Sequence, residues 1–257
     1  MRPRRGPIYG GGSGCQSCNG NAGANNFPLK GGKHSNFEGG VRVNALVAGG
    51  LLPQGARGST LSALTAMEDV YPTLCALAGV EAFDARGAAA GLPPVEGHNL
   101  WPLLSGANAT APRTEVWLGS SGAVHSASAS GATPSTPATF VQGLIRADGW
   151  KLLHDVLDNA AYQGPFYPNA TTAAHPWNNS QVDCGSAAAP RCLYNVFEDP
   201  TEHVNMAAAR PDIVAAMAAR LAQLQAGVFS PDRGSASPLA CAASRERWGG
   251  FVGPFLP

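Results

Sequence analysis

The chain has no excess of charge of either sign. Its 257 residues include 17 Lys and Arg against 17 Asp and Glu, so the formal net charge is zero. Proteins that bind nucleic acid neutralise phosphates with a surplus of basic residues or with a basic patch. The basic cluster Arg2, Arg4 and Arg5 stands at the very start of the sequence and is typical of a frayed terminus. The composition therefore predicts no nucleic-acid partner.

Long apolar runs are also missing. A membrane-spanning helix needs roughly 18 or more consecutive apolar residues, and no such run occurs. The first residues, MRPRRGPIYGGG, are basic but lack the apolar stretch of a signal peptide. We therefore expect no membrane span and no signal peptide within these residues.

Large apolar side chains are scarce. Alanine supplies much of the 44% hydrophobic content, and only 7% of the residues are aromatic. The chain can form one large domain or two small ones, with a thin core. Residues 1–24 are a Gly-rich start that we expect to be mobile. Residues 119–139 are of low complexity, rich in Ser, Ala, Gly, Thr and Pro. They cannot bury enough apolar surface to become ordered, so they predict a flexible insert.

Metal-binding patterns are incomplete. Cys15 and Cys18 form a CxxC pair, but no second pair or HExxH pattern completes a zinc site. A local disulfide or two free thiols is the favoured interpretation. Cys75, on a predicted helix, should be a buried free thiol.

Other features favour an oxidising compartment. Cys184 and Cys192 stand eight residues apart across a Gly/Ala/Pro loop and predict a disulfide. Three N-x-[ST] sequons, at Asn108, Asn169 and Asn178, predict glycosylation sites. These features without a signal peptide predict a fragment of a longer secreted protein.

The coarse order of elements divides at the low-complexity insert. Before it, an apolar run predicts a strand over 41–47. A helix is expected over 70–78, with Asp69 as its N-cap and with Leu74, Leu77 and Ala78 on its apolar face. After the insert, Asp148-Gly149 predicts a hairpin between 140–147 and 150–156. A strand over 192–197 and an amphipathic helix from Pro211 to near Gly227 follow, so we expect an antiparallel sheet with one helix on a face.

The segment 25–42, NNFPLKGGKHSNFEGGVR, is the strongest candidate site. Its glycines allow close backbone approach, and Lys30, Lys33 and His34 can present positive charge to an anionic ligand. From the residues alone, a solvated basic loop remains an equal alternative.

This segment resembles the sulfatase family, whose members carry N-N-x-P-L-[RK]-G-x-K-x-S-x-[FW]-E-G-G-x-R at the edge of the active site. The resemblance assigns Lys33 to the lysine that contacts the substrate sulfate. Lys30 and His34 are weaker candidates for the same field. Three further segments resemble family patterns: MEDVYPTLCALAGV at 67–80, EGHNLWPLL at 96–104 and CLYNVFEDPTEHVNMA at 192–207. The resemblance assigns the carboxylates Glu198, Asp199 and Glu202 a structural role, in a turn that packs the small sheet on the large domain.

The resemblance implies an α/β fold in two parts. Residues 1–118 would be the tail of the large sulfatase α/β sandwich domain. After the insert at 119–139, residues 140–257 would be the small α+β C-terminal subdomain, an antiparallel sheet plus one helix.

The implied function is hydrolysis of sulfate esters, on a sulfated small molecule or glycan, in a secreted or lysosomal (vacuolar-type) compartment. Family members use formylglycine, made from the first residue of C-x-P-x-R or S-x-P-x-R, and a calcium ion. None of the six cysteines here has Pro two residues on and Arg four on, and the calcium carboxylates are not found. The chain by itself is therefore predicted to be inactive. The alternatives are a non-catalytic secreted glycoprotein module, or a related phosphoesterase or phosphonate hydrolase.

Overall fold

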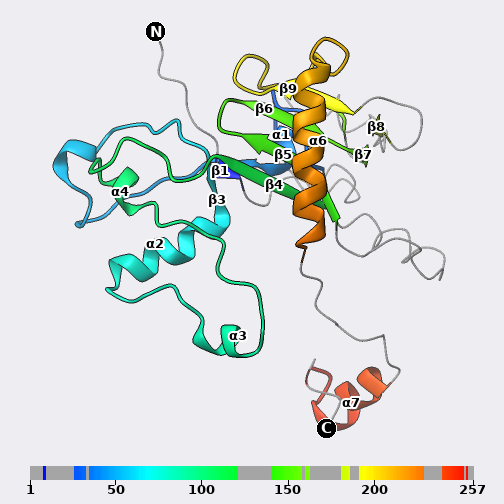
Figure 1. Ribbon diagram of the computed structural model, residues 1–257. Coiled ribbons are helices and arrows are strands. Elements are labelled where there is room, and N and C mark those ends of the chain that lie inside the picture. The colour runs from blue at the N-terminus through cyan, green and yellow to red at the C-terminus, as the bar shows by residue number, and fades with distance from the viewer. Residues whose placement is uncertain are drawn as a thin grey trace, which may run out of the picture.

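The structure is a computed structural model that describes residues 8–9, 26–32, 35–120, 140–157, 160–162, 181–185, 191–228, 239–251 and 253. Its centre is a four-stranded antiparallel sheet in the order β4-β5-β6-β9 (Figure 1). The strands are β4 (Glu115–Ser120), β5 (Phe140–Arg146), β6 (Trp150–Leu153) and β9 (Cys192–Asn195). The mixed α/β character and the antiparallel sheet agree with the expected fold. Residues 121–139, most of the predicted insert, lie outside the described residues.

The hairpin predicted at Asp148-Gly149 is present. Gly149 has φ +90°, a conformation that favours glycine, and its N–H donates to the carbonyl of Arg146 at 2.9 Å. The second strand is shorter than predicted. It ends at Leu153, and Asp155 has φ +73°, which turns the chain out of the sheet. Residues Asp155–Leu157 form β7, which pairs instead with β8 (Val182–Cys184).

One face of the sheet is covered by α6 (Pro211–Ala226), which crosses the strands in Figure 1. Proline at the first helical position fits the start of the helix, and Gly227 follows its end. The predicted helix is therefore confirmed. The buried residues of this layer come from alternate strand positions and from one helix stripe; they are Leu144, Leu152, Leu193, Ile213, Met217 and Leu221.

The other face of the sheet packs against the segment 35–41. Phe37 is fully buried there, with Val116, Ile145, Leu153 and Tyr194 in the same apolar cluster. Successive strand residues point to opposite faces, so Lys151 lies on this face between residues that contact α6. The segment with the sulfatase-like motif is thus a layer of the core, which places any site on it directly over the sheet.

The predicted disulfide between Cys184 and Cys192 is present. It joins β8 to β9, and both cysteines are buried. Cys75 is free, as predicted, but it is only half-buried. Cys15 and Cys18 lie outside the described residues.

The first part of the chain contains short elements. A three-stranded sheet in the order β2-β1-β3 combines Arg42–Val43, Ile8–Tyr9 and Thr65–Ala66. The strand expected over 41–47 is wrong in its extent. Val41 ends helix α1 (Glu38–Val41), only Arg42–Val43 is a strand, and Leu46 is 92% exposed. No described layer packs on residues 44–50, so the apolar run has nothing to hold it extended. The remaining elements here are η1 (Gln54–Ala56), η2 (Met67–Asp69), α2 (Val70–Leu77), α3 (Ala85–Ala89) and α4 (Trp101–Leu104); the last helix of the chain is α7 (Leu239–Arg247).

Helix α2 is present where it was predicted, but its expected contacts are wrong. Its buried residues are Pro72 and Thr73, whereas Leu74 is exposed. Asp69 stands at the N-cap position, as predicted, but its side chain makes no capping hydrogen bond to the helix. Its carboxylate instead accepts hydrogen bonds from the N–H groups of Ala66 and His98, each at 2.8 Å, and forms an ion pair with Arg113. Burial alone would raise the pKa of Asp69, but these partners hold it below its usual range. The Asp69 side chain is therefore used for a contact with a residue 44 positions away and not for capping.

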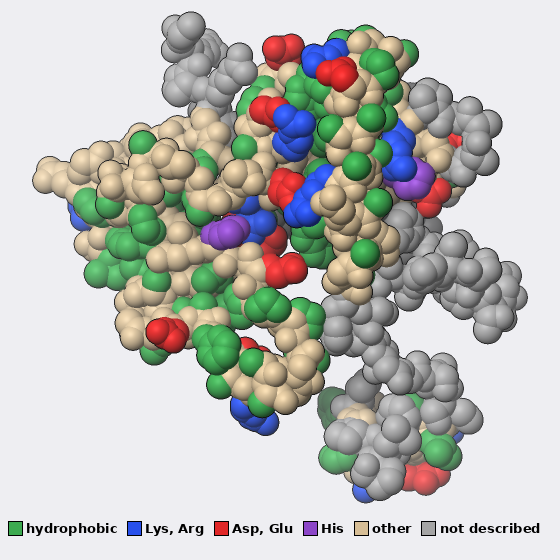
Figure 2. Space-filling model, viewed as in Figure 1, with side chains coloured by type: hydrophobic (Ala, Val, Ile, Leu, Met, Phe, Trp, Pro, Cys, Tyr) green, Lys and Arg blue, Asp and Glu red, His purple; other side chains and the backbone are tan. Residues whose placement is uncertain are grey.

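Large apolar side chains remain exposed around these short elements, and Figure 2 shows them as green patches beside the sheet. They are Leu46, Leu51, Met67, Val70, Tyr71, Leu74, Val80 and Phe83. Apolar surface of this extent marks an interaction site or an aggregation hazard. In the part of the chain that the structure describes, no helix is long and apolar enough to cross a membrane.

Candidate functional site

The candidate site is the segment 26–43, described on both sides of Lys33 and His34. These two residues themselves lie outside the described residues, so their contact with substrate stays a prediction. On one side, Lys30, Gly31 and Gly32 are buried. On the other side, residues 35–40 are buried as well. A solvated basic loop would expose these residues, so the loop alternative does not fit the two flanks.

Glycines allow the two flanks to lie against each other. The N–H of Gly39 donates to the carbonyl of Lys30 at 2.7 Å, and the N–H of Ser35 donates to that of Gly32 at 3.0 Å. A Cβ on Gly39 would lie 2.6 Å from the oxygen of Lys30 and even closer to that of Gly31. A Cβ on Gly40 would collide with the backbone of Gly32 and Ser35. The Gly-Gly pair is therefore required by close backbone approach.

Lys30 lies beneath the segment in a pocket of aromatic rings. Its ammonium is 4.2 Å from the centre of the Phe37 ring and 5.6 Å from the rings of Tyr162 and Tyr194. Such cation–π contacts stabilise a desolvated cation. Burial lowers the pKa of Lys30, and nearby Glu202 partly opposes that shift. The side chain is only 9% exposed, so it supports the segment from below, and any effect on a ligand acts through its charge.

A buried ion cluster joins the segment to the small sheet. We call Glu38, Lys151 and Glu202 the buried triad. The ammonium of Lys151 lies 3.0 Å from Oε1 of Glu38 and 2.8 Å from Oε1 of Glu202. The other oxygen of Glu202 accepts a hydrogen bond from the backbone N–H of Glu38 at 2.6 Å. All three side chains are fully buried.

Each member of the triad comes from a different part of the chain. Glu38 begins α1, Lys151 is in β6, and Glu202 ends the turn after Asp199 and Pro200. The turn is fixed locally, because the N–H of Glu202 donates to the carbonyl of Asp199 at 3.1 Å. Glu202 has φ +56°, a left-handed conformation that costs a non-glycine residue about 1–2 kcal/mol. The turn thus directs its carboxylate into the core, in line with the structural role expected for these carboxylates.

The triad has two carboxylates and one ammonium, so its charges do not cancel when all three groups are ionised. Burial raises the pKa of Glu202 to about 7, and the neighbouring charge of Glu38 adds to this, while Lys151 opposes it. Burial alone would lower the pKa of Lys151, but the two carboxylates raise it above its usual value. Lys151 therefore stays charged, and Glu202 is the member that takes up a proton near neutral pH.

A buried amide pair fixes the start of the second flank. The Nδ2 of Asn36 donates to Oε1 of Gln142 at 2.7 Å and to the carbonyl of Gly119 at 3.0 Å. The Nε2 of Gln142 donates to the carbonyl of Val156 at 3.2 Å. The bonds of Asn36 attach the segment to β4 and β5, and Gln142 in turn links β5 to β7.

The described residues do not fit a calcium ion. Within the described ranges, no group of three His, Cys, Asp or Glu side chains could hold a metal. The two buried carboxylates beneath the segment already neutralise Lys151, whose ammonium stands where a cation would have to lie. Any calcium chemistry of the sulfatase family must therefore use ligands other than these.

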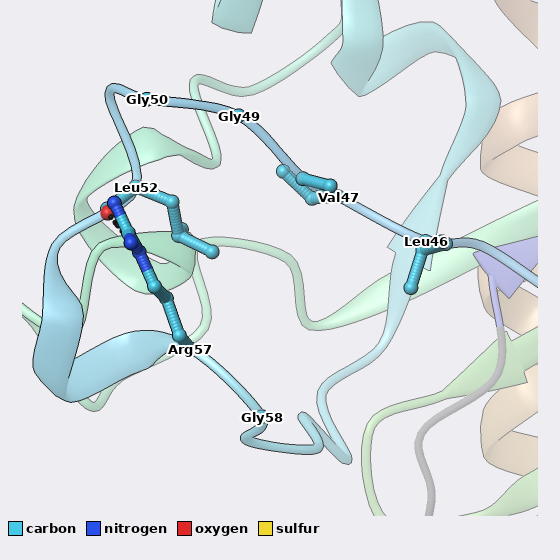
Figure 3. A pocket seen from close by; sticks show the side chains of 8 residues that line it. Leu46, Val47, Gly49, Gly50, Leu52, Arg57 and Gly58 are labelled. Atoms are coloured by element: carbon cyan, nitrogen blue, oxygen red, sulfur yellow. Dashed lines mark hydrogen bonds between the residues drawn. The ribbon is translucent and has the colours of Figure 1, made fainter.

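One cavity of the described structure lies away from this segment. It has a volume of about 440 Å³ and lies in the loop from Leu46 to Gly58. Figure 3 shows Leu52 and Arg57 on one side of it and Leu46 and Val47 on the other. Arg57 already donates to the carbonyl of Leu52 at 3.1 Å. Apart from Arg57, the lining is glycine and aliphatic residues, so this hollow offers no group suited to acid–base or nucleophilic chemistry.

The predicted glycosylation sites remain predictions. Asn108 is exposed in the turn after α4, where its Oδ1 accepts a hydrogen bond from the N–H of Thr110 at 2.9 Å. Asn169 and Asn178 lie outside the described residues.

Sequence reasoning did not identify Lys151 or Gln142. A lysine between a tryptophan and a leucine in a strand has the usual appearance of a solvent-facing residue. The alternation of strand residues between the two faces of the sheet could have identified it. Ile145 and Leu153 lie on the same face as Lys151 and are buried, so Lys151 is buried there too and needs a partner.

Comparisons with known proteins found similarity to sulfatases in sequence. No protein-family model matches the chain. It is 28% identical over 207 residues to arylsulfatase J of Mus musculus, which covers 79% of this chain and 32% of that protein. Among solved structures, one from the metabolism of multiple glycosaminoglycans by Bacteroides thetaiotaomicron has a TM-score of 0.45 at 17% identity, covering 77% of this chain and 32% of that one. The phosphonate monoester hydrolase of Agrobacterium radiobacter has a TM-score of 0.36 at 19% identity, covering 67% and 27%.

The chain is therefore similar to a sulfatase over most of its length, as the motif at 25–42 indicated. One such relative is arylsulfatase J, and this chain spans about a third of the length of that protein. The two structural similarities are too weak to add to this.

The close approach of the two flanks gives a first test. Gly39→Ala should lower the free energy of unfolding by about 2 kcal/mol, because the new methyl group meets fixed backbone atoms. Urea unfolding measures this loss. Gly55→Ala is the matched control, since a Cβ there meets open space. Equal effects at the two positions would contradict the packed arrangement of the flanks.

The triad predicts a pH dependence. The folded pKa of Glu202, about 7, lies above the ordinary value of 4.5. The folded state therefore binds more protons over this interval, and the free energy of unfolding falls as pH rises through 7. Between pH 5 and 8 the chain should lose about 2 kcal/mol relative to Glu202→Gln, which cannot titrate.

Urea unfolding of both proteins across this range measures the difference. His154, whose pKa is lowered chiefly by burial, has the opposite dependence but is present in both proteins and cancels. Parallel curves for the two proteins would show that Glu202 is ionised throughout.

Proposed function

We propose that this chain supplies the sulfate-binding edge of a sulfuric ester hydrolase, with Lys33 as the residue that contacts the sulfate group. The observation that supports the proposal is the burial and hydrogen bonding of the residues on both sides of Lys33. Residues on both sides of Lys33 are buried and hydrogen-bonded, so the backbone that bears it is held at both ends. The match to the sulfatase motif and the relation to arylsulfatase J support the same role.

A fixed ammonium at Lys33 stabilises the anionic ester and the charge that develops as the S–O bond breaks. Such a contact is effective when the donor is held in place before the reaction, because little reorganisation is needed. Lys30 supplies a second positive charge from within the aromatic pocket, and His34 is a weaker contributor. Both add to the local field.

The chain itself carries no residue for the nucleophilic step. No cysteine stands in a C-x-P-x-R pattern, so formylglycine has no precursor among these residues. Electrostatic help without a nucleophile leaves most of the barrier in place. In an intact hydrolase, the nucleophile and the calcium ligands come from residues outside this chain. The substrate class is a sulfated small molecule or glycan, and the disulfide supports a secreted or lysosomal setting.

A second candidate is a secreted module that binds sulfate groups without cleaving them. The observation that favours it is the same missing nucleophile pattern. The two candidates share the sulfate contact at Lys33 and differ in turnover. An in-frame C-x-P-x-R pattern in the transcript upstream would favour the hydrolase.

The sulfate contact can be tested directly on the 257-residue chain. Titration with inorganic sulfate, followed by the NMR signals of Gly31, Gly32, Gly39 and Gly40, should give a saturable shift. Lys33→Ala should weaken this binding by about tenfold, because a charge contact in a confined site is lost. Arg57→Ala, which removes an exposed cation elsewhere, should leave it unchanged. Equal binding by all three proteins would remove Lys33 from the site.

The same preparation tests turnover. A chromogenic aryl sulfate should not be hydrolysed, with or without added calcium. Turnover that disappears in Lys33→Ala would show that an unrecognised nucleophile lies within these residues.

A further inference from the structure

The buried triad lies directly under the proposed sulfate-contacting segment. Glu38 immediately precedes Gly39, whose N–H bonds to the carbonyl of Lys30 on the other side of Lys33. Lys30 in turn lies in the field of Glu202, which raises its pKa, and of Lys151, which lowers it. The ion cluster therefore acts on both flanks of the segment.

The triad fixes the orientation of the segment on the sheet as well as its distance from the sheet. Phe37, Leu153 and Tyr194 already provide an apolar contact between the segment and the sheet. Apolar packing of this kind is not directional. Glu202 adds direction, because its two oxygens bind the ammonium of Lys151 and the backbone N–H of Glu38 at the same time. This sets where the chain turns into the Gly39-Gly40 pair.

We infer that Lys151, Glu38 and Glu202 are positioning residues for sulfate binding: they hold the two described flanks of the segment, residues 30–32 and 35–40, at one place over the sheet. This inference rests on the proposed function of Lys33. Buried ion clusters contribute little to stability compared with apolar packing of the same volume, so a cluster retained here is better explained by the orientation that it imposes.

Further contacts of Lys151 and Glu38 support this role. Lys151 lies in register with Tyr194 on the neighbouring strand, and the ring of Tyr194 also borders the pocket of Lys30. Movement of Lys151 would therefore reach Lys30 through a shared neighbour. On the outer side, Arg42 lies 3.7 Å from Oε2 of Glu38, so that carboxylate is held from both directions.

The experiment compares three variants of the 257-residue chain with the unchanged chain. Lys151→Met removes the ammonium and keeps the length of the side chain. Glu202→Gln is milder, because its amide oxygen still accepts from the N–H of Glu38, and it carries the test if Lys151→Met does not fold. Leu221→Ala is the control. It weakens the core under α6, on the opposite face of the sheet, without touching the triad.

Two readouts are needed. Hydrogen exchange of the Gly31 and Gly39 amides, relative to the slowest amides of the core, reports local opening of the segment. NMR titration with inorganic sulfate reports binding by the folded chain. Lys151→Met should raise the relative exchange of both glycines by about tenfold and weaken sulfate binding by about tenfold. Glu202→Gln should change both in the same direction, by roughly threefold. Leu221→Ala should change neither.

The inference is overturned if the triad variants behave like Leu221→Ala, with exchange that follows global stability and unchanged sulfate binding. It is also overturned if sulfate binding weakens without local opening, because the triad would then act on the ligand by charge alone. Absence of sulfate binding in the unchanged chain, with normal exchange protection, would instead contradict the proposed function. The exchange data would then still decide whether the triad holds the segment.

Discussion

Lys151 carries an ammonium group into a sheet face that is mainly apolar, with no exposure to solvent. An isolated charge in such a place would cost several kcal/mol, so the lysine requires partners that are equally buried. Glu38 and Glu202 supply them from segments 113 residues before and 51 residues after it in the chain. Because the buried ammonium of Lys151 needs two carboxylates, the sulfatase-like motif, the sheet and the Asp199–Glu202 turn are held together at this point. Neither motif can be understood alone, because each provides one half of the lysine's coordination.

This constraint also explains why the sheet has two different faces. The face under α6 is held mainly by apolar packing along one stripe of the helix, together with an ion pair between Arg220 of the helix and Glu115 of β4. The other face is covered by an irregular, glycine-rich segment, which has little apolar surface to contribute apart from Phe37. Charge, amide and cation–π contacts replace the missing hydrophobic area, through Lys151, Gln142 and Lys30. The polar groups that hold this layer therefore lie beneath the residues expected to meet the ligand.

Local sequence signals identified what depends on local contacts. The Asp148-Gly149 hairpin, the stripe of α6 and the short loop between Cys184 and Cys192 were all predicted correctly, because neighbouring residues determine each of them. The strand over 41–47 and the buried face of α2 were predicted wrongly, because no described layer packs on Leu46 or Leu74. Asp69 was expected to cap a helix, but Arg113 draws it elsewhere. At the site, the motif correctly indicated the segment and the close backbone approach at its glycines. The burial of Lys151 at the site was not predicted, because its partners are more than 50 residues away in the sequence.

The central claim is that Glu202 and Lys151 act on the segment as one unit. A double-mutant cycle on the free energy of unfolding, with Lys151→Met, Glu202→Gln and both changes together, measures this coupling most directly. We expect a coupling energy of about 2 kcal/mol or more, because Lys151→Met leaves two buried carboxylates without their ammonium, and Glu202→Gln removes one of those carboxylates, so that Lys151→Met costs less when Glu202→Gln is already present. Additive losses, with a coupling below about 0.5 kcal/mol, would mean that the two residues contribute independently and would contradict the account.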